Sequence, residues 1–387
     1  MNITGIITEY NIFHNGHKYQ IDEIKKHSDA VIAVMSGSFV QRGDVAITDK
    51  WSRAKMALSG GVDLVIELPV CYGLNAAPNF ATGGINILNA LGVVNNICFG
   101  SESGSIDELM SAAELLENEN SEISEKIKKY VMGGMSYPNA LTKAYSALIP
   151  SDILSEPNNI LATEYIRALI RSDSKIKPMT VKRHKAGYHD RNLYQNIASA
   201  TKLREMKRNN ENINDFIPYK LEDINCDIPY DISNLDSAII SKLRLMTAED
   251  LQNISEVTEG IENRILSSAN MSYSFETLVE NVKNKRYTTS KIRRMIISAL
   301  IGFTKDIYSP MPQYIRILGM NKVGMTILKQ AKDTCKVPII TKTADFKEQS
   351  PQFNLDVRAT NIAMLCNPIP THRIGNADLK KSPIIMK

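Results

Sequence analysis

The chain has 387 residues, 43% of them apolar and 23% charged, with a net charge of +4. This is the composition of a globular protein with room for two domains, and no apolar run is long enough to span a bilayer. The five cysteines are scattered without a paired Cys-x-x-Cys spacing, and the N-terminus lacks the pattern of a signal peptide. These features argue against a disulfide framework, a zinc site and a membrane protein, and they favour the reducing cytoplasm.

The first hundred residues alternate short apolar runs with helical patterns. The runs at 3–8, 30–35, 62–68 and 96–99 are typical of buried parallel strands, and helical patterns lie between them at 17–26, 51–58 and 80–91. This alternation predicts an α/β fold with a doubly wound parallel sheet, which binds its ligands at the carboxyl ends of the strands.

The rest of the chain completes a first domain and adds a second one. Residues 105–150 are predicted to be largely helical, 158–170 a helix, 179–183 a fifth strand, and a helix starting at Ser199 closes the first domain near residue 215. A second, mainly helical domain is predicted over 216–387. Helical patterns are amphipathic at 241–251 and 290–302, and 337–341 is a short β-like run.

The segment His14-Asn15-Gly16-His17 follows the first strand and opens the first helix. A glycine at a strand-to-helix turn lets backbone N–H groups approach a ligand, and the helix N-terminus carries partial positive charge. Two imidazole N–H donors at that place can stabilise charge that develops on an α-phosphate. Two surface histidines at a turn are the simpler reading, but the position after the first strand favours a phosphate site.

A second segment, Ser199 to Arg204 (SATKLR), also sits at a predicted helix start. Ser199 is a typical helix cap, and capping leaves N–H groups free for a phosphate. Thr201 and Arg204 are candidate donors to the far phosphates of the same ligand. Together the two segments predict an enzyme that splits ATP at its α-phosphate, with His14, His17 and Arg204 as catalytic residues.

Positive charge gathers late in the chain. Residues 311–387 hold twelve Lys/Arg against five Asp/Glu, and the stretch 283–294 has six basic side chains and no acidic one. Charge alone allows either a solvated helix face or a polyanion partner. If the partner is a nucleic acid, the predicted contacts are Lys283, Lys285, Arg286, Lys291, Arg293 and Arg294, with Tyr287 among them as a candidate for stacking on a base.

Longer stretches resemble a known family. GIITEYNIFHNGH (5–17), SGSFVQRGD (36–44), FGSES (99–103), EPNNILATEY (156–165), KRHKAGYHD (182–190) and KRYTTSKIRR (285–294) are similar to the bacterial tRNA(Met) cytidine acetate ligases, which belong to the nucleotidyltransferase superfamily. The resemblance covers roughly the first 300 residues. It departs at Ile12, where the family commonly has proline, and at His184, where an apolar residue is more usual.

The resemblance implies a Rossmann-like nucleotidyltransferase core that activates acetate with ATP. Acetyl-adenylate and pyrophosphate form first, and the acetyl group then passes to N4 of the wobble cytidine of elongator tRNA(Met), releasing AMP. The family's ATP site, carried over position by position, adds Ile7, Thr8, Glu9, Tyr10, Asn11, Ile12, Phe13, His14, Asn15, Gly16, His17, Lys18, Tyr19, Gln20, Gly100, Asn158 and Arg183 to Ser199, Thr201 and Arg204.

Several roles stay open at this stage. Mg²⁺ is expected with the triphosphate, although no acidic cluster clearly holds it. Glu9 and Glu102 suit either magnesium or ribose contacts or helix capping, and Arg42 suits either a phosphate contact or solvent. The alternative functions are an adenylyltransferase that acts on a small phosphorylated cofactor precursor and a noncatalytic RNA-binding protein.

Overall fold

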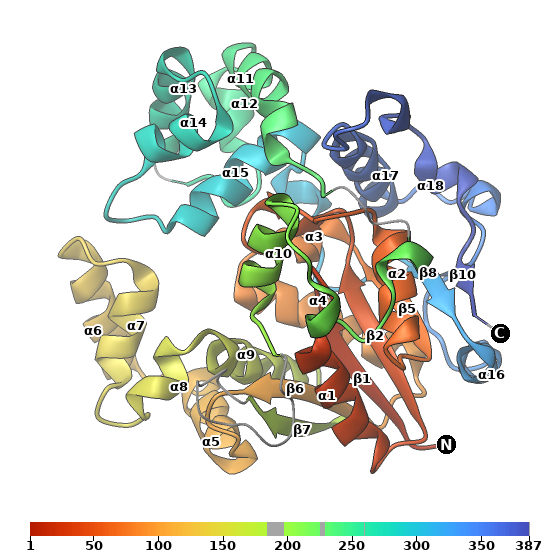
Figure 1. Ribbon diagram of the computed structural model, residues 1–387. Helices are drawn as coiled ribbons and strands as arrows, with labels where there is room; N and C mark the ends of the chain where they lie inside the picture. The colour runs from red at the N-terminus through yellow and green to blue at the C-terminus, as the bar shows by residue number, and fades with distance from the viewer. Residues whose placement is uncertain (184–196, 225–228, 259, 387) are drawn as a thin grey trace.

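The computed structural model describes residues 1–183, 197–224, 229–258 and 260–386. Its centre is a sheet of eight strands in the order β10-β8-β5-β2-β1-β6-β7, with β9 paired to β8 (Figure 1). The strands of this sheet are β1 (Ile3–Thr8), β2 (Ala30–Ser36), β5 (Leu64–Leu68), β6 (Asn96–Ser101), β7 (Lys177–Lys182), β8 (Ile315–Met320), β9 (Ile339–Ile340) and β10 (Ile384–Ile385). A separate hairpin consists of β3 (Phe39–Val40) and β4 (Asp44–Val45).

The predicted doubly wound sheet is confirmed. β1, β2, β5, β6 and β7 run parallel, and the chain reverses its direction of winding between β1 and β6. The first strand matches its predicted range, and the others differ from theirs by one or two residues at one or both ends. A crevice for ligands is expected at this reversal, outside the carboxyl ends of β1 and β6.

Helices cover both faces of the sheet because successive side chains of a strand point to opposite sides. Ile3 and Ile7 of β1 pack in one core with α4 (Ala77–Leu91) and α9 (Pro157–Arg171). Ile6 packs in the other core with α1 (Asn15–Lys25) and α2 (Lys50–Ser59). At Gly5 a Cβ would lie 2.6 Å from Leu88 of α4, so only glycine allows this helix to approach β1 so closely.

An arm and a helical body stand beside the sheet. The arm follows β6, and its helices confirm the prediction for 105–150: α5 (Ile106–Glu117), α6 (Ser121–Met132), α7 (Tyr137–Tyr145) and α8 (Ser151–Ser155). The helical body consists of α11 (Asp236–Arg244), α12 (Ala248–Gln252), α13 (Ile261–Met271), α14 (Phe275–Val282) and α15 (Thr289–Ile301). In Figure 1, α6 and α7 and the helical body form two separate projections, in yellow and in green to cyan.

The amphipathic pattern at 241–251 is not one helix. α11 ends at Arg244, and Thr247 then caps α12: its hydroxyl accepts from the Asp250 N–H at 3.1 Å, while the Asp250 carboxylate accepts from the Thr247 N–H at 2.8 Å. This reciprocal cap starts a new helix inside an apolar pattern that continues across the break.

The sheet crosses the domain boundary predicted at residue 215, so that prediction needs correction. β8 pairs antiparallel with β5, and β10 pairs with β8, so the end of the chain completes the sheet that its beginning starts. A buried ionic cluster also joins the end of the chain to the sheet. In it, Lys50 of α2 and Arg316 of β8 both contact Asp378 of α18 (Ala377–Lys380) and Glu67 of β5. The predicted helical domain is therefore the helical body alone.

The remaining elements complete the fold. They are α3 (Val70–Gly73), α10 (Ala200–Arg208), α16 (Lys322–Ala331), α17 (Pro351–Met364) and the 3-10 turns Asn214–Phe216, Leu221–Asp223, Ile232–Leu235, Lys305–Ile307, Thr343–Asp345 and Pro370–His372. No helix among the described residues is both long and apolar enough to cross a membrane.

Candidate nucleotide-binding site

The two histidines of HNGH cap the helix that they open. The His14 Nδ1 accepts from the Gly16 N–H at 3.1 Å, and the His17 Nδ1 accepts from the His14 N–H at 3.3 Å. Their rings stack with centroids 3.8 Å apart. Because both Nδ1 atoms are acceptors, the proton of each neutral ring lies on Nε2, which is left as a donor for a ligand.

Both imidazoles are neutral at physiological pH. Burial, together with the Arg183 and Arg204 guanidiniums, lowers the pKa of His14 to about 4. Burial, His14 and Arg183 hold the pKa of His17 well below its ordinary value. Two stacked rings in a positively charged surrounding can both remain only as uncharged N–H donors, and such donors bind a phosphate oxygen without a change of protonation.

Aromatic packing fixes the position of this turn. The Phe13 ring is fully buried, and a Cβ at Gly60 would lie 2.2 Å from it. Tyr10 contacts both Phe13 and His17, with ring centroids 4.7 and 4.9 Å away. Several side chains of the predicted ATP stretch are therefore core residues that shape the turn, and these are Ile7, Tyr10, Ile12 and Phe13.

The structure brings the second motif against the first. Ser199 caps α10, its hydroxyl accepting from the Lys202 N–H at 3.2 Å. Arg204 crosses to β1's end and donates to the Asn11 carbonyl, while its other nitrogen donates to the Thr201 hydroxyl at 3.1 Å. Segments 193 positions apart thus meet at the carboxyl end of β1, as one shared phosphate ligand requires.

The neighbouring strand β6 adds a third side to the site. A Cβ at Gly100 would lie 3.1 Å from the Arg183 side chain, so this glycine leaves room for Arg183 beside the strand. The Arg183 N–H donates to the Ser101 carbonyl at 2.8 Å, which continues the strand pairing beyond β7. One edge of the sheet thus carries four of the predicted site residues, which are His14, Gly100, Arg183 and Arg204.

Glu102 is a helix cap. Its carboxylate accepts from the Asn159 N–H at 2.8 Å and from the Asn158 side-chain amide at 2.5 Å. Asn159 returns the contact, its Oδ1 accepting from the N–H groups of Glu102 and Ser103 at 2.9 and 3.1 Å. The start of α9 is thereby tied to the end of β6. Asn159, which is fully buried, was missed from the sequence, and its place beside Asn158 in EPNN was the available signal.

Glu9 holds the loop of residues 36–45, the SGSFVQRGDV loop. Its carboxylate accepts from the Gln41 N–H at 2.7 Å. Burial raises the pKa of Glu9, whereas that hydrogen bond and the Arg204, Arg53 and Arg42 guanidiniums lower it. Arg53, fully buried, donates to the backbone carbonyls of Glu9 and Gly37 and so joins the same two segments. Sequence reasoning missed Arg53 because nothing local marks it.

Two of the six predicted RNA-binding residues require correction. Arg294 pairs with the Glu256 carboxylate at 2.5 and 2.8 Å and donates to the Gln41 carbonyl at 3.1 Å. Arg293 pairs with Glu276 at 2.6 Å and donates to the Gly43 carbonyl at 2.9 Å. Their side chains are only 9% and 14% exposed, so both tie α15 to the SGSFVQRGDV loop and are not available to a phosphate.

The other four basic residues lie at the surface. Lys283, Lys285 and Arg286 are exposed, and Lys291 is half-buried with its ammonium 5.0 Å from the centre of the Tyr287 ring. The Tyr287 hydroxyl donates to the Thr258 carbonyl at 3.1 Å, so that ring packs on the helical body. Residues 184–190 of the KRHKAGYHD motif lie outside the described residues.

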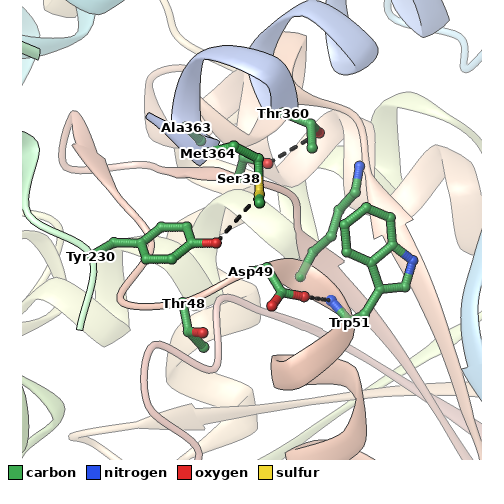
Figure 2. A pocket seen from close by; sticks show the side chains of 9 residues that line it. Ser38, Thr48, Asp49, Trp51, Tyr230, Thr360, Ala363 and Met364 are labelled. Atoms are coloured by element: carbon green, nitrogen blue, oxygen red, sulfur yellow. Dashed lines mark hydrogen bonds between the residues drawn. The ribbon is translucent and has the colours of Figure 1, made fainter. Parts of the chain in front are cut away.

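A small cavity lies behind the SGSFVQRGDV loop, next to the buried ionic cluster. Its volume is about 10 Å³, enough for one water molecule and too small for an organic substrate. Ser38, Thr48, Asp49, Trp51, Tyr230 and Thr360 are among the side chains that line it (Figure 2). The cavity is thus a small gap in the packing beneath the loop and not a substrate site.

Metal ligands are sparse near the site. Within the described ranges, no three His, Cys, Asp or Glu side chains lie close enough together to hold a metal ion. Glu9 and Glu102, the acidic candidates from the sequence, already accept backbone hydrogen bonds. A magnesium ion here would therefore take most of its ligands from phosphate oxygens and water, as this ion commonly does.

Comparison with known proteins agrees with this geometry. The family model described as "HIGH Nucleotidyl Transferase" matches residues 1–378. A protein of Clostridium novyi named "tRNA(Met) cytidine acetate ligase" is 40% identical, and one of Acetivibrio thermocellus with the same name is 38% identical, each over the full length of both chains. The crystal structure of Thermotoga maritima TmcAL bound with alpha-thio ATP superposes with a TM-score of 0.90 at 32% identity, covering all of both chains.

Proposed function

Because the chain belongs to the HIGH nucleotidyl transferase family and matches tRNA(Met) cytidine acetate ligases over its whole length, we propose that it joins acetate to tRNA(Met) with ATP. The product is N4-acetylcytidine at the wobble position of elongator tRNA(Met), and the by-products are AMP and pyrophosphate. The single observation that carries this proposal is the meeting of His14, His17 and Arg204 at the winding reversal of the sheet.

In the first step an acetate oxygen attacks the α-phosphorus of ATP and pyrophosphate leaves, which gives acetyl-adenylate. Negative charge grows on the α-phosphoryl oxygens and on the leaving group. The Nε2–H groups of His14 and His17 donate to these oxygens, and their hydrogen bonds strengthen as the charge develops. Arg204 and the N–H groups that Ser199 leaves open at the start of α10 bind the departing phosphates.

In the second step the N4 amine of the cytidine attacks the acetyl carbon and AMP leaves. The base must be unstacked from the anticodon loop to reach a site at the sheet edge, as single-stranded RNA readers require. No covalent intermediate with the protein is needed, so the protein's part is positioning and electrostatic stabilisation. Exposed Lys283, Lys285 and Arg286, with half-buried Lys291, are the basic residues that we assign to the tRNA backbone.

The test is the release of pyrophosphate from ATP and Mg²⁺, measured with and without acetate and with and without total tRNA. Acetate-dependent release, with labelled acetyl appearing in tRNA, is the expected result. Release that ignores acetate but responds to a phosphorylated cofactor precursor would identify an adenylyltransferase instead. ATP binding without release would contradict any catalytic reading.

A further inference from the structure

We propose that Arg42 binds a phosphodiester of the RNA substrate next to the nucleotide that reacts, and so guides the base into the site. This inference rests on the proposed function. Arg42 lies at the tip of the β3–β4 hairpin and carries an exposed side chain. No hydrogen bond or ion pair joins its guanidinium to another of the described residues, in contrast to its neighbours on the same turn.

The turn that carries Arg42 is rigidly built. Gly43 has a φ of +74°, and its N–H donates to the Val40 carbonyl at 2.9 Å. A Cβ at Gly43 would lie 2.6 Å from the Arg293 Cβ and 2.7 Å from the Arg294 nitrogen. The tip of the hairpin therefore lies directly on α15, and only glycine fits there.

Each residue beside Arg42 is held by a charged group. The Gln41 N–H donates to Glu9 at 2.7 Å, and the Gln41 carbonyl accepts from Arg294 at 3.1 Å. On the other side, the Gly43 carbonyl accepts from Arg293 at 2.9 Å. Charged groups thus fix the backbone on both sides of one unpaired guanidinium, so only the Arg42 side chain loses conformational freedom when it binds an anion.

The charges around the turn leave a positive surplus. Asp44 is shared between Arg293 at 3.8 Å and Arg208 of α10 at 4.0 Å, and Glu9 is occupied by its backbone hydrogen bond. Arg204 lies on the same side of α10, close enough for Arg42 to contribute to lowering its pKa. Arg42 and Arg208 are the exposed arginines near Arg204.

The position of Arg42 favours RNA over the smaller substrates. A triphosphate bound at His14, His17 and Arg204 occupies the buried part of the site, whereas Arg42 faces solvent. Its turn packs on α15, which begins three residues after Arg286, the last of the exposed basic residues Lys283, Lys285 and Arg286. The turn of Arg42 thus contacts both α15 and Glu9, which follows β1, and a phosphate contact there fixes the register of the strand that delivers the base.

The experiment compares Arg42→Ala with Arg42→Lys and with Lys175→Ala. Lys175 is an exposed cation just before β7, at the amino edge of the sheet, so its loss matches the change in charge away from the site. The dissociation constant of an elongator tRNA(Met) transcript is measured over a series of salt concentrations. Acetate-dependent exchange of pyrophosphate into ATP is measured without RNA.

We expect Arg42→Ala to weaken transcript binding about tenfold, as loss of a charge-assisted hydrogen bond does, and to reduce the salt slope by about 0.7. Arg42→Lys recovers part of the affinity and the full slope, and Lys175→Ala changes neither. In RNA-free exchange, Arg42→Ala and Lys175→Ala behave alike.

Two results would overturn the proposal. One is an Arg42→Ala protein whose affinity and salt slope equal those of Lys175→Ala, because Arg42 would then be only a solvated charge. The other is loss of acetate-dependent exchange in the absence of RNA, because Arg42 would then serve ATP or acetate. Failure of the proposed function itself would show differently, as absence of acetate-dependent exchange in the wild-type protein.

Discussion

Replacing Arg294 by alanine separates a structural role from an RNA-binding role. The Arg294 side chain is 9% exposed and that of its partner Glu256 is 13% exposed. Truncation leaves the Glu256 carboxylate without its partner and the Gln41 carbonyl without a donor. Breaking a largely buried pair costs about 3 kcal/mol, which lowers the midpoint of thermal unfolding by roughly 4 °C in a protein of 387 residues.

Thermal unfolding monitored by circular dichroism measures this cost, with Arg286→Ala as the matched control. Arg286 belongs to the same basic stretch but is exposed, so its removal leaves the midpoint nearly unchanged. In the double variant Glu256→Ala/Arg294→Ala no unpaired carboxylate remains. We therefore expect its loss in the free energy of unfolding to be smaller, by more than about 1 kcal/mol, than the sum of the losses in the two single variants. An Arg294→Ala protein that unfolds at the wild-type temperature and has lost only its RNA affinity would contradict a structural role of Arg294.

Three further predictions address the site and its supports. His17→Ala should lower acetate-dependent pyrophosphate exchange by about 10²–10³-fold while the dissociation constant of the tRNA stays unchanged; equal losses in both would contradict the assignment of His17 to the phosphates. The pKa of His14 is about 4 in the folded protein, below the ordinary 6.5, so the unfolded chain binds more protons and stability falls as the pH drops from 6.5 toward 4. Urea unfolding at pH 6.5 and pH 4 measures this fall. The free energy of unfolding should fall less in His14→Asn than in the wild type, and an identical fall would show that His14 is not buried as a neutral group. Gly43→Ala should cost about 1–3 kcal/mol more than Gly134→Ala, since both glycines have positive φ but only Gly43 faces atoms within 4 Å; equal urea midpoints would contradict the close packing on α15.

The regular part of the fold could be predicted from the sequence because its signals are local. The apolar run 3–8 between polar ends predicts a buried strand, and HNGH after it predicts a helix start at the sheet edge. Both are confirmed, as β1 and as the cap of α1. The return of the chain to the same sheet through β8 and β10 could not be predicted, because the pairing of β5 with β8 joins residues about 250 positions apart.

The exposure of the basic side chains in one motif could not be predicted from the sequence either. KRYTTSKIRR reads as a uniform basic stretch, but α15 turns Arg293 and Arg294 toward Glu276, Glu256 and the SGSFVQRGDV loop. Arg286, three residues before the helix begins, faces solvent. Which arginine is exposed depends on carboxylates that lie elsewhere in the chain, and no spacing rule within the motif encodes them.

Acetylation of the tRNA itself can be measured directly. tRNA incubated with the protein, ATP, Mg²⁺ and isotopically labelled acetate is digested to nucleosides and analysed by mass spectrometry, with His17→Ala as the control. We expect labelled N4-acetylcytidine at a single position, the wobble position of elongator tRNA(Met), and none with the variant. Labelled product that forms equally with His17→Ala, or pyrophosphate release with no acetylated nucleoside, would contradict it.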